Sequence, residues 1–218
     1  MYNHLYLEKE IAEIDQFHEE GFNRVKTWYK TPEERRQEVT GLDIPPHESM
    51  LERAAGFVEW GLGIQVSIRG TIDDDPGVTE IYEIFLAIGS EMLLKAGILK
   101  IDPEYYFENS STERSMDFEK AKNKILGELS QELTDDQRKR LTLVLDLLKI
   151  KRDESVHFGF HRQGHHGHPK EIYKALDYLF LRFGGENKDI NEVLRKQIEE
   201  QQQLHVGLDY EQVKYPTS

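Results

Sequence analysis

The fold is indicated most strongly by residues 134–157, which read TDDQRKRLTLVLDLLKIKRDESVH. Thr134 and Gln137 have the spacing of a capping box, in which two side chains three residues apart cap the start of a helix. Apolar residues then recur at helical intervals in two stripes, which predicts a long helix to about Val156, central in a bundle. The first stripe comprises Leu141, Val144, Leu145 and Leu148, and the second comprises Leu143, Leu147 and Ile150.

Helical periodicity continues along the rest of the chain, and strand-like alternation is scarce. We therefore expect an all-α protein, an antiparallel helical bundle with an extra N-terminal helix. The expected helices, besides the long one, are 5–29, 47–69, 78–99, 115–130, 171–183 and 187–204. A polar connector with the Pro45-Pro46 pair separates the first two, because such a pair does not fit inside a helix. The expected organisation is an N-terminal extension at 1–45, a bundle at 46–204 and a loosely ordered tail at 205–218.

Composition excludes several kinds of chemistry. The 218 residues include no cysteine, so disulfides, thiolate catalysis and Cys-ligated metal sites are excluded. The net charge of −13 excludes a general basic surface for nucleic acid. Charge is nevertheless segregated, because residues 138–182 carry +5 and five of the nine histidines. A local basic site is therefore expected in this segment.

The N-terminal sequence has no basic leader followed by an apolar core. No uncharged run approaches the roughly 18 residues that a membrane helix needs. We therefore expect no membrane association and a cytoplasmic location.

Two polar side chains continue the apolar stripes at the end of the long helix. Arg152 follows Leu148 by four residues, and His157 follows Ile150 by seven. On an ideal helix, five residues correspond to about 140° of rotation and about 7.5 Å of rise. The sequence therefore predicts that Arg152 and His157 flank a shared groove.

This arrangement resembles the signature of the HEPN domains (higher eukaryote and prokaryote nucleotide-binding). In that family an Arg is followed after four to six residues by a His, near the C-terminal end of a long helix in an all-α bundle. The matching residues here are Arg152-Asp153-Glu154-Ser155-Val156-His157. Glu91 and Lys95 resemble the Glu-x-x-x-Lys element of many members, and the resemblance covers roughly residues 49–183. Gly159 stands where some members carry a tyrosine whose modification silences them, so this control is not expected here.

The resemblance implies a bundle of HEPN type that acts as a metal-independent RNA endonuclease, without a cofactor, leaving 2′,3′-cyclic phosphate ends. His157, with an ordinary pKa of about 6.5, would act as base or acid near neutral pH. Arg152 would stabilise the charge that grows on the phosphate. Because members usually pair two such helices across a dimer, a homodimer is implied as well. A toxin or defence role, in which an antitoxin protein would be a further partner, comes from the resemblance alone.

Several neighbouring residues are expected to assist. Glu91 and Lys95, four residues apart on one helical face, would orient Arg152 or contact substrate, although an ordinary surface ion pair is an open alternative. Asp153 is expected to accept a hydrogen bond from Arg152 or from the backbone. The substrate-binding residues in this hypothesis are Lys151, His161 and Arg162.

Other interpretations of the same residues remain open. Arg152 alone is also typical of a cation at a helix C-terminus, and His157 of a buried or capping histidine. A non-catalytic module that binds a nucleotide or a protein is the alternative function, and the overall acidity favours it. A His-ligated metal site is a weaker hypothesis because no HExxH pattern occurs, and Phe158 and Phe160 are either core residues or stacking platforms for bases. The candidate metal ligands are His157, His161, His165, His166 and His168.

Overall fold

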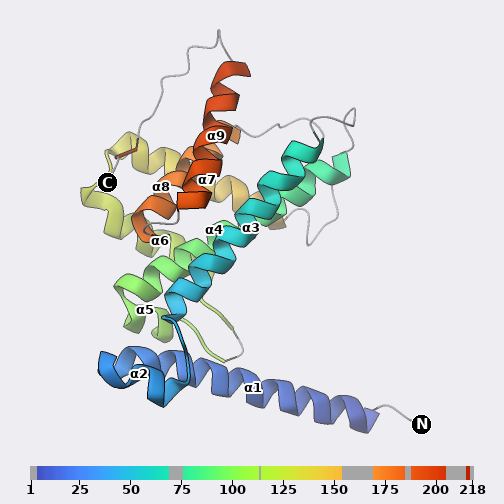
Figure 1. Ribbon diagram of the computed structural model, residues 1–218, viewed down its shortest axis with the longest axis vertical. Helices are drawn as coiled ribbons and strands as arrows, with labels where there is room; N and C mark the ends of the chain where they lie inside the picture. Colours follow the sequence, from blue (N-terminus) through green and yellow to red (C-terminus); the bar gives the residue numbers. More distant parts are fainter. Residues whose placement is uncertain are drawn as a thin grey trace.

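The computed structural model describes residues 4–68, 76–112, 114–153, 169–184, 188–204 and 215–216. Within these ranges all regular secondary structure is helical, which confirms the predicted all-α class (Figure 1). The helices are α1 His4–Lys30, α2 Glu33–Thr40, α3 Pro46–Ile68, α4 Pro76–Ile101, α5 Pro103–Glu108, α6 Phe118–Glu128, the 3-10 helix η1 Leu129–Gln131, α7 Asp135–Asp153, α8 Pro169–Leu179, the π-helix η3 Phe180–Gly184 and α9 Lys188–Leu204.

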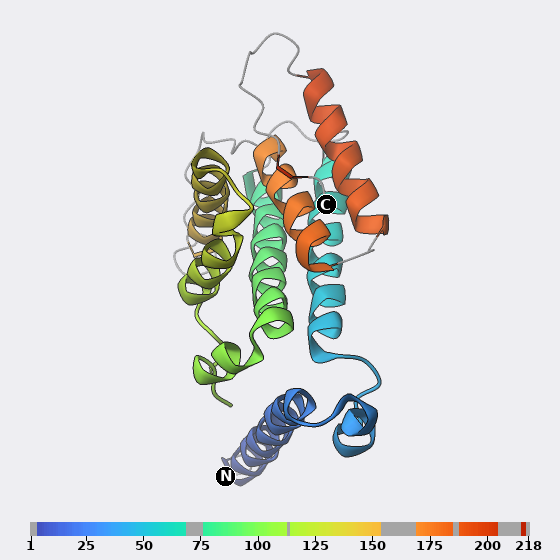
Figure 2. The same cartoon turned by 90° about the vertical axis from the view of Figure 1, so that its left-hand side faces the viewer.

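Helix α4 forms the centre of the bundle. It packs along α3 and also contacts α5, α6, α7 and α8. Figure 2 shows α4 between α3 on one side and α6 and α7 on the other. Leu93, Leu94, Ile98 and Leu99 have no exposed surface, so this helix is covered by neighbours on several sides. The most apolar helix therefore occupies the middle of the core.

Helix α7 buries only the first of its two predicted stripes. The side chains of Leu141, Leu145 and Leu148 are fully buried, and Val144 is almost so. In the second stripe Leu143 and Ile150 are 59% and 51% exposed, and Leu147 is half-buried. The prediction of a central position for this helix is therefore wrong, because two apolar stripes do not establish that both are covered.

The predicted start of α7 is confirmed. The backbone N–H of Gln137 donates to Thr134 Oγ1 at 3.3 Å, and the backbone N–H of Thr134 donates to Gln137 Oε1 at 2.8 Å. These reciprocal bonds satisfy two donors at the helix start, as a capping box does. The cap therefore defines where α7 begins.

Two short helices were not predicted. Helix α2 lies inside the segment expected to be a polar connector, and it ends at Gly41, which has a left-handed φ of 63°. Helix α5 lies inside the polar break after α4, where Asp102 caps it by accepting from the backbone N–H of Tyr105 at 3.1 Å. Neither segment carries a long apolar stripe, so periodicity did not reveal it.

Helix α1 lies across one end of the bundle (Figures 1 and 2). Its C-terminal half packs there, with Trp28 only 9% exposed and the ring of Phe22 5.6 Å from that of Phe107 in α5. The Tyr29 hydroxyl is hydrogen-bonded to His47 Nδ1 at 3.0 Å, and burial raises the pKa of Tyr29 to about 12. These contacts attach the predicted N-terminal extension to the start of α3 and to α5.

Helix α3 contains three glycines, and close helix packing accounts for Gly61, where an added Cβ would lie 3.0 Å from Tyr82 O. Close packing does not account for Gly56 and Gly63, where an added Cβ would meet nothing within 4 Å.

In the predicted tail, the ring of Tyr215 stacks on Tyr178 at 5.0 Å, and most of the tail lies outside the described residues. The described helices include none with the length and apolar character to cross a membrane.

Helix α8 packs one face into the core. The side chains on this face, and the first one of η3, are buried. These residues are Ile172, Ala175, Leu176, Leu179 and Phe180.

Candidate functional site

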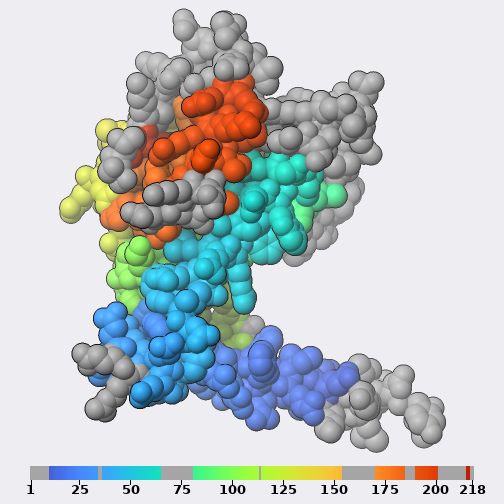
Figure 3. Space-filling model, viewed as in Figure 1, coloured from blue at the N-terminus to red at the C-terminus, as the bar shows by residue number. Residues whose placement is uncertain are grey.

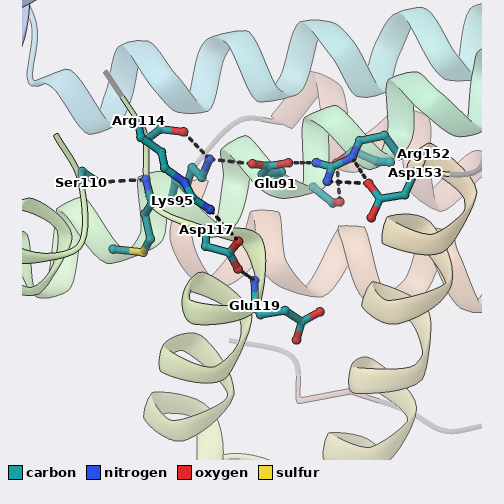
Figure 4. A network of polar contacts seen from close by, with 12 residues as sticks. Glu91, Lys95, Ser110, Arg114, Asp117, Glu119, Arg152 and Asp153 are labelled. Carbon is teal, nitrogen blue, oxygen red and sulfur yellow. Dashed lines mark hydrogen bonds and ion pairs between the residues drawn. The ribbon is translucent and has the colours of Figure 1, made fainter. Parts of the chain in front are cut away.

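Arg152 lies in the last described turn of α7 and reaches across to α4. Its NH1 group forms an ion pair with Glu91 Oε2, while its Nε and NH2 groups donate to Asp153 Oδ1 at 3.0 and 2.8 Å. Figure 4 shows the guanidinium between the two carboxylates. The ring of Phe118, from α6, lies 6.0 Å from the guanidinium carbon. The Arg152 side chain is 24% exposed, so the cation is held in place but still accessible to solvent.

Glu91 is shared between two cations. Lys95, one turn further along α4, donates to Glu91 Oε1 at 2.6 Å and to Ser115 Oγ at 2.9 Å. Figure 4 shows Glu91 between Lys95 and Arg152. The Lys95 side chain is 9% exposed, so the alternative of an ordinary surface ion pair does not describe it. The predicted Glu-x-x-x-Lys element is therefore joined directly to the predicted Arg.

Asp153 completes the network on α7. It accepts hydrogen bonds from Arg152, as expected, and also from Lys149 Nζ at 2.9 Å. Burial disfavours the charged form of Arg152, but hydrogen bonds with Asp153 and the charge of Glu91 hold its pKa above the ordinary value. Burial likewise opposes ionisation of Asp153, yet Lys149 and Arg152 hold its pKa below the ordinary value. Both groups are therefore charged at neutral pH.

The network is suited to binding an anion. It contains three cations, Lys95, Lys149 and Arg152, and two carboxylates. The described contacts of Arg152 use its Nε–H and one N–H on each terminal nitrogen. The second N–H of each terminal nitrogen makes no hydrogen bond within the described part of the chain. A guanidinium with such donors remaining binds phosphate oxygens well.

Among the other predicted site residues, Lys151 is the one that the structure describes. It pairs with Glu83 of α4, its Nζ 3.2 Å from Oε2, and does not join this network. His157, His161 and Arg162 lie outside the described residues, as do Phe158, Phe160 and the other histidines of the Gly-His loop. Where the chain is described, no group of three or more His, Asp or Glu side chains is arranged to hold a metal ion. The histidines of the hypothetical metal site lie outside the described residues.

Three residues of the network were missed in the sequence. Lys149 precedes Asp153 by four residues, so the helical spacing of opposite charges was a signal for it. Ser115 precedes α6 and Phe118 is its first residue, and both reach the site because α6 packs beside α4 and α7. No local pattern points to them.

Replacing Asp153 by Asn is expected to lower the free energy of unfolding by roughly 1 kcal/mol at pH 7, because it weakens charged hydrogen bonds with Arg152 and Lys149. The folded-state pKa of Asp153 is depressed, so its stabilisation is present above the ordinary pKa of about 3.9 and is lost as the pH falls through the folded-state value. Urea unfolding should therefore show a difference between wild type and variant that narrows from pH 7 to pH 3. Asp15→Asn on exposed α1 is the control, expected within ~0.5 kcal/mol of wild type at both pH values. A constant difference for Asp153→Asn would contradict the assignment.

Comparison with known proteins adds no relative to this geometry. The chain matches no protein-family model, no curated protein and no solved structure. A function must therefore be inferred from the residues of the site and from the sequence pattern that they complete.

Proposed function

We propose that this protein is a metal-independent RNA endonuclease of the HEPN type, in which Arg152 and His157 form the catalytic pair. The observation that supports it most directly is the placement of Arg152, charged and half-buried at the end of α7 and held by Glu91 and Asp153. The resemblance to the family's Arg and Glu-x-x-x-Lys elements rests on residues that come into contact in the fold. That contact joins two parts of the motif that are 61 residues apart.

RNA carries its own nucleophile, and this limits what the enzyme must supply. The 2′-oxygen attacks the adjacent phosphorus, the bond to the 5′-oxygen breaks, and a 2′,3′-cyclic phosphate and a 5′-hydroxyl result. A base takes the proton of the 2′-hydroxyl and an acid gives one to the 5′-oxygen, and an imidazole with an ordinary pKa of about 6.5 serves either role. Arg152 stabilises the additional charge on the phosphorane oxygens. Lys151, His161 and Arg162 are proposed to bind the RNA backbone.

A homodimer is part of the proposal. Two copies of His157 would supply the base and the acid together, and two copies of Arg152 would line one basic cleft. The second stripe of α7 supports an association at this helix, because Leu143 and Ile150 of the same helix are more than half exposed. Exposed apolar patches of this kind mark interaction surfaces. A toxin or defence role, with an antitoxin as a further partner, belongs to the same proposal.

Incubation of the full chain with labelled single-stranded and structured RNAs in EDTA tests the activity. Cleavage is expected to persist in EDTA, to leave 2′,3′-cyclic ends, and to fall by about 10²–10⁴-fold in His157→Ala, because a general acid or base contributes that much. Arg53→Ala, at an exposed position of α3, is the control and should cleave as wild type does. If no RNA in a broad range is cleaved, the proposal of a nuclease is contradicted.

A non-catalytic binding module is the second candidate. The net charge of −13 favours this candidate, because the acidic parts of the chain outside the basic segment repel long RNA. It is also consistent with the ion pairs of Arg152 with Glu91 and Asp153, because such pairs can stabilise the fold as well as position a catalytic residue. Calorimetric titration with mononucleotides separates the two functions: saturable binding without cleavage of any RNA supports the module.

A further inference from the structure

The first half of α1 presents an apolar stripe to solvent. We define the α1 arm as residues 10–20, in which Ile11, Ile14 and Phe17 are 55%, 54% and 73% exposed. The same helical stripe continues into the half of α1 that packs on the bundle. Figure 3 shows the arm standing clear of the body of the molecule, with open space between it and α3. A solvent-exposed stripe that continues a packed one indicates an unoccupied contact surface.

A second apolar stripe lies on α7. We define the α7 stripe as Leu143, Leu147 and Ile150, of which the outer two are more than half exposed. Lys139, which is exposed, precedes Leu143 by one turn, and Lys151 follows Leu147 by one turn. An exposed basic side chain, that of Lys139, therefore flanks one end of this stripe, and Lys151 at the other end is also paired with Glu83 of α4.

The charges of the two surfaces are opposite. The α1 arm contains five Asp or Glu and no Lys or Arg. Helix α7 contains six Lys or Arg against four Asp or Glu. Pairing of two arms would bring together two strongly acidic helices, and pairing of two α7 stripes would bring together two basic ones. Contact between an arm and an α7 stripe is the combination that charge favours.

The two surfaces are not neighbours within one chain. Figures 1 and 2 show α1 across the end of the bundle near α5, whereas α7 lies alongside α4 further along it. The arm is long enough to cover the stripe, because 11 residues of helix span about 16 Å and the seven steps from Leu143 to Ile150 span about 10 Å. A second copy of the chain therefore brings the two surfaces together.

We propose that the α1 arm of each copy docks on the α7 stripe of the other copy. Reciprocal docking produces a closed dimer with two-fold symmetry, in which each contact occurs twice. This inference rests on the homodimer of the proposed function and adds what covers α7. Two residues correspond to about 200° of rotation on a helix, so the docked arm covers the face of α7 that points away from Arg152.

Cysteine cross-linking tests this docking, because the natural chain contains no cysteine. Phe17→Cys and Leu143→Cys are purified separately, mixed to allow exchange of subunits, and oxidised. Both positions are exposed, at 73% and 59%, so both variants should fold, as circular dichroism checks. A disulfide-linked dimer is expected on a non-reducing gel in the mixture, at a yield at least several-fold above either variant alone. Gln16→Cys, also exposed on the arm but outside its apolar stripe, is the matched control and should not cross-link to Leu143→Cys.

Each of the other outcomes contradicts the proposed docking. None of them tests the nuclease activity. Cross-linking of Leu143→Cys alone places α7 on α7, and cross-linking of Phe17→Cys alone places arm on arm. If no sample forms a cross-link, the α1 arm and the α7 stripe are not in contact, and this outcome also contradicts the proposal. Since this readout needs no RNA, a positive cross-link with an inactive protein would refute only the nuclease. An active nuclease without the mixed cross-link would refute only the docking.

Discussion

Replacing Arg152 by alanine is expected to lower kcat/KM for RNA cleavage by about a thousandfold, because the side chain stabilises charge that develops in the transition state. The fold is expected to survive. Glu91, which loses one cation, keeps its hydrogen bond from Lys95 at 2.6 Å, so no unpaired carboxylate is left in the site. Initial rates on a labelled RNA in EDTA measure the activity, and circular dichroism at 222 nm measures the fold.

Two substitutions make this test specific. Arg182→Ala removes another ion-paired arginine, one that forms a bidentate pair with Glu132 at 2.6–3.1 Å and has no contact with Glu91 or Asp153 in the described structure, and it should leave cleavage unchanged. Arg152→Lys keeps the charge but loses the planar fork that contacts Glu91 and Asp153 together, so roughly 10–100-fold of activity should be lost. If Arg152→Ala cleaves as well as Arg182→Ala, then Arg152 is a structural residue and the nuclease mechanism fails.

The sequence predicted what depends on neighbours along the chain. The capping box at Thr134 is a local arrangement, so its residues determine it without help from the rest of the fold. The contact between Glu91 and Lys95 also follows from a spacing of four residues on a helix. The first stripe of α7 was predicted correctly for the same reason, since its residues repeat with the period of the helix.

Which apolar stripe the fold covers was not predictable in this way. The second stripe of α7 has the same residue types and spacing as the first, yet Leu143 is 59% exposed. Periodicity records where apolar side chains lie on a helix and contains no information about which neighbour packs there. The central position assigned to α7 belongs to α4, whose residues from Leu93 to Leu99 are all buried.

The candidate site was predictable only as separate pieces. Arg152 and Glu91 were each selected by local pattern and resemblance, but their ion pair joins α7 to α4 and depends on how those helices pack. Phe118 enters the site from α6, and no spacing in the sequence connects it to Arg152. Contacts between distant segments therefore required the three-dimensional structure.

Replacing Gly89 by valine is expected to lower the free energy of unfolding by roughly 3 kcal/mol, the upper part of the range for overpacking a core. Gly89 lies on α4 where it crosses α3, and an added Cβ would come 2.7 Å from Val58 Cγ2 and 3.0 Å from Ala54 O. Val58 is fully buried and β-branched, and Ala54 O is backbone, so neither neighbour moves easily. The two helices that pack most extensively would have to separate.

Alanine at the same position separates packing from helix propensity. Alanine is better than glycine inside a helix by about 1 kcal/mol, but the clash should exceed this gain, so Gly89→Ala is expected to destabilise by about 1 kcal/mol. Gly56→Ala on α3 is the matched control: an added Cβ there meets nothing within 4 Å, so it should stabilise by about 0.5–1 kcal/mol. Urea unfolding followed by circular dichroism gives all three values. A stabilising Gly89→Ala would show that α3 and α4 do not approach as closely as described, and the position of Glu91 relative to Arg152, which depends on the placement of α4, would then need revision.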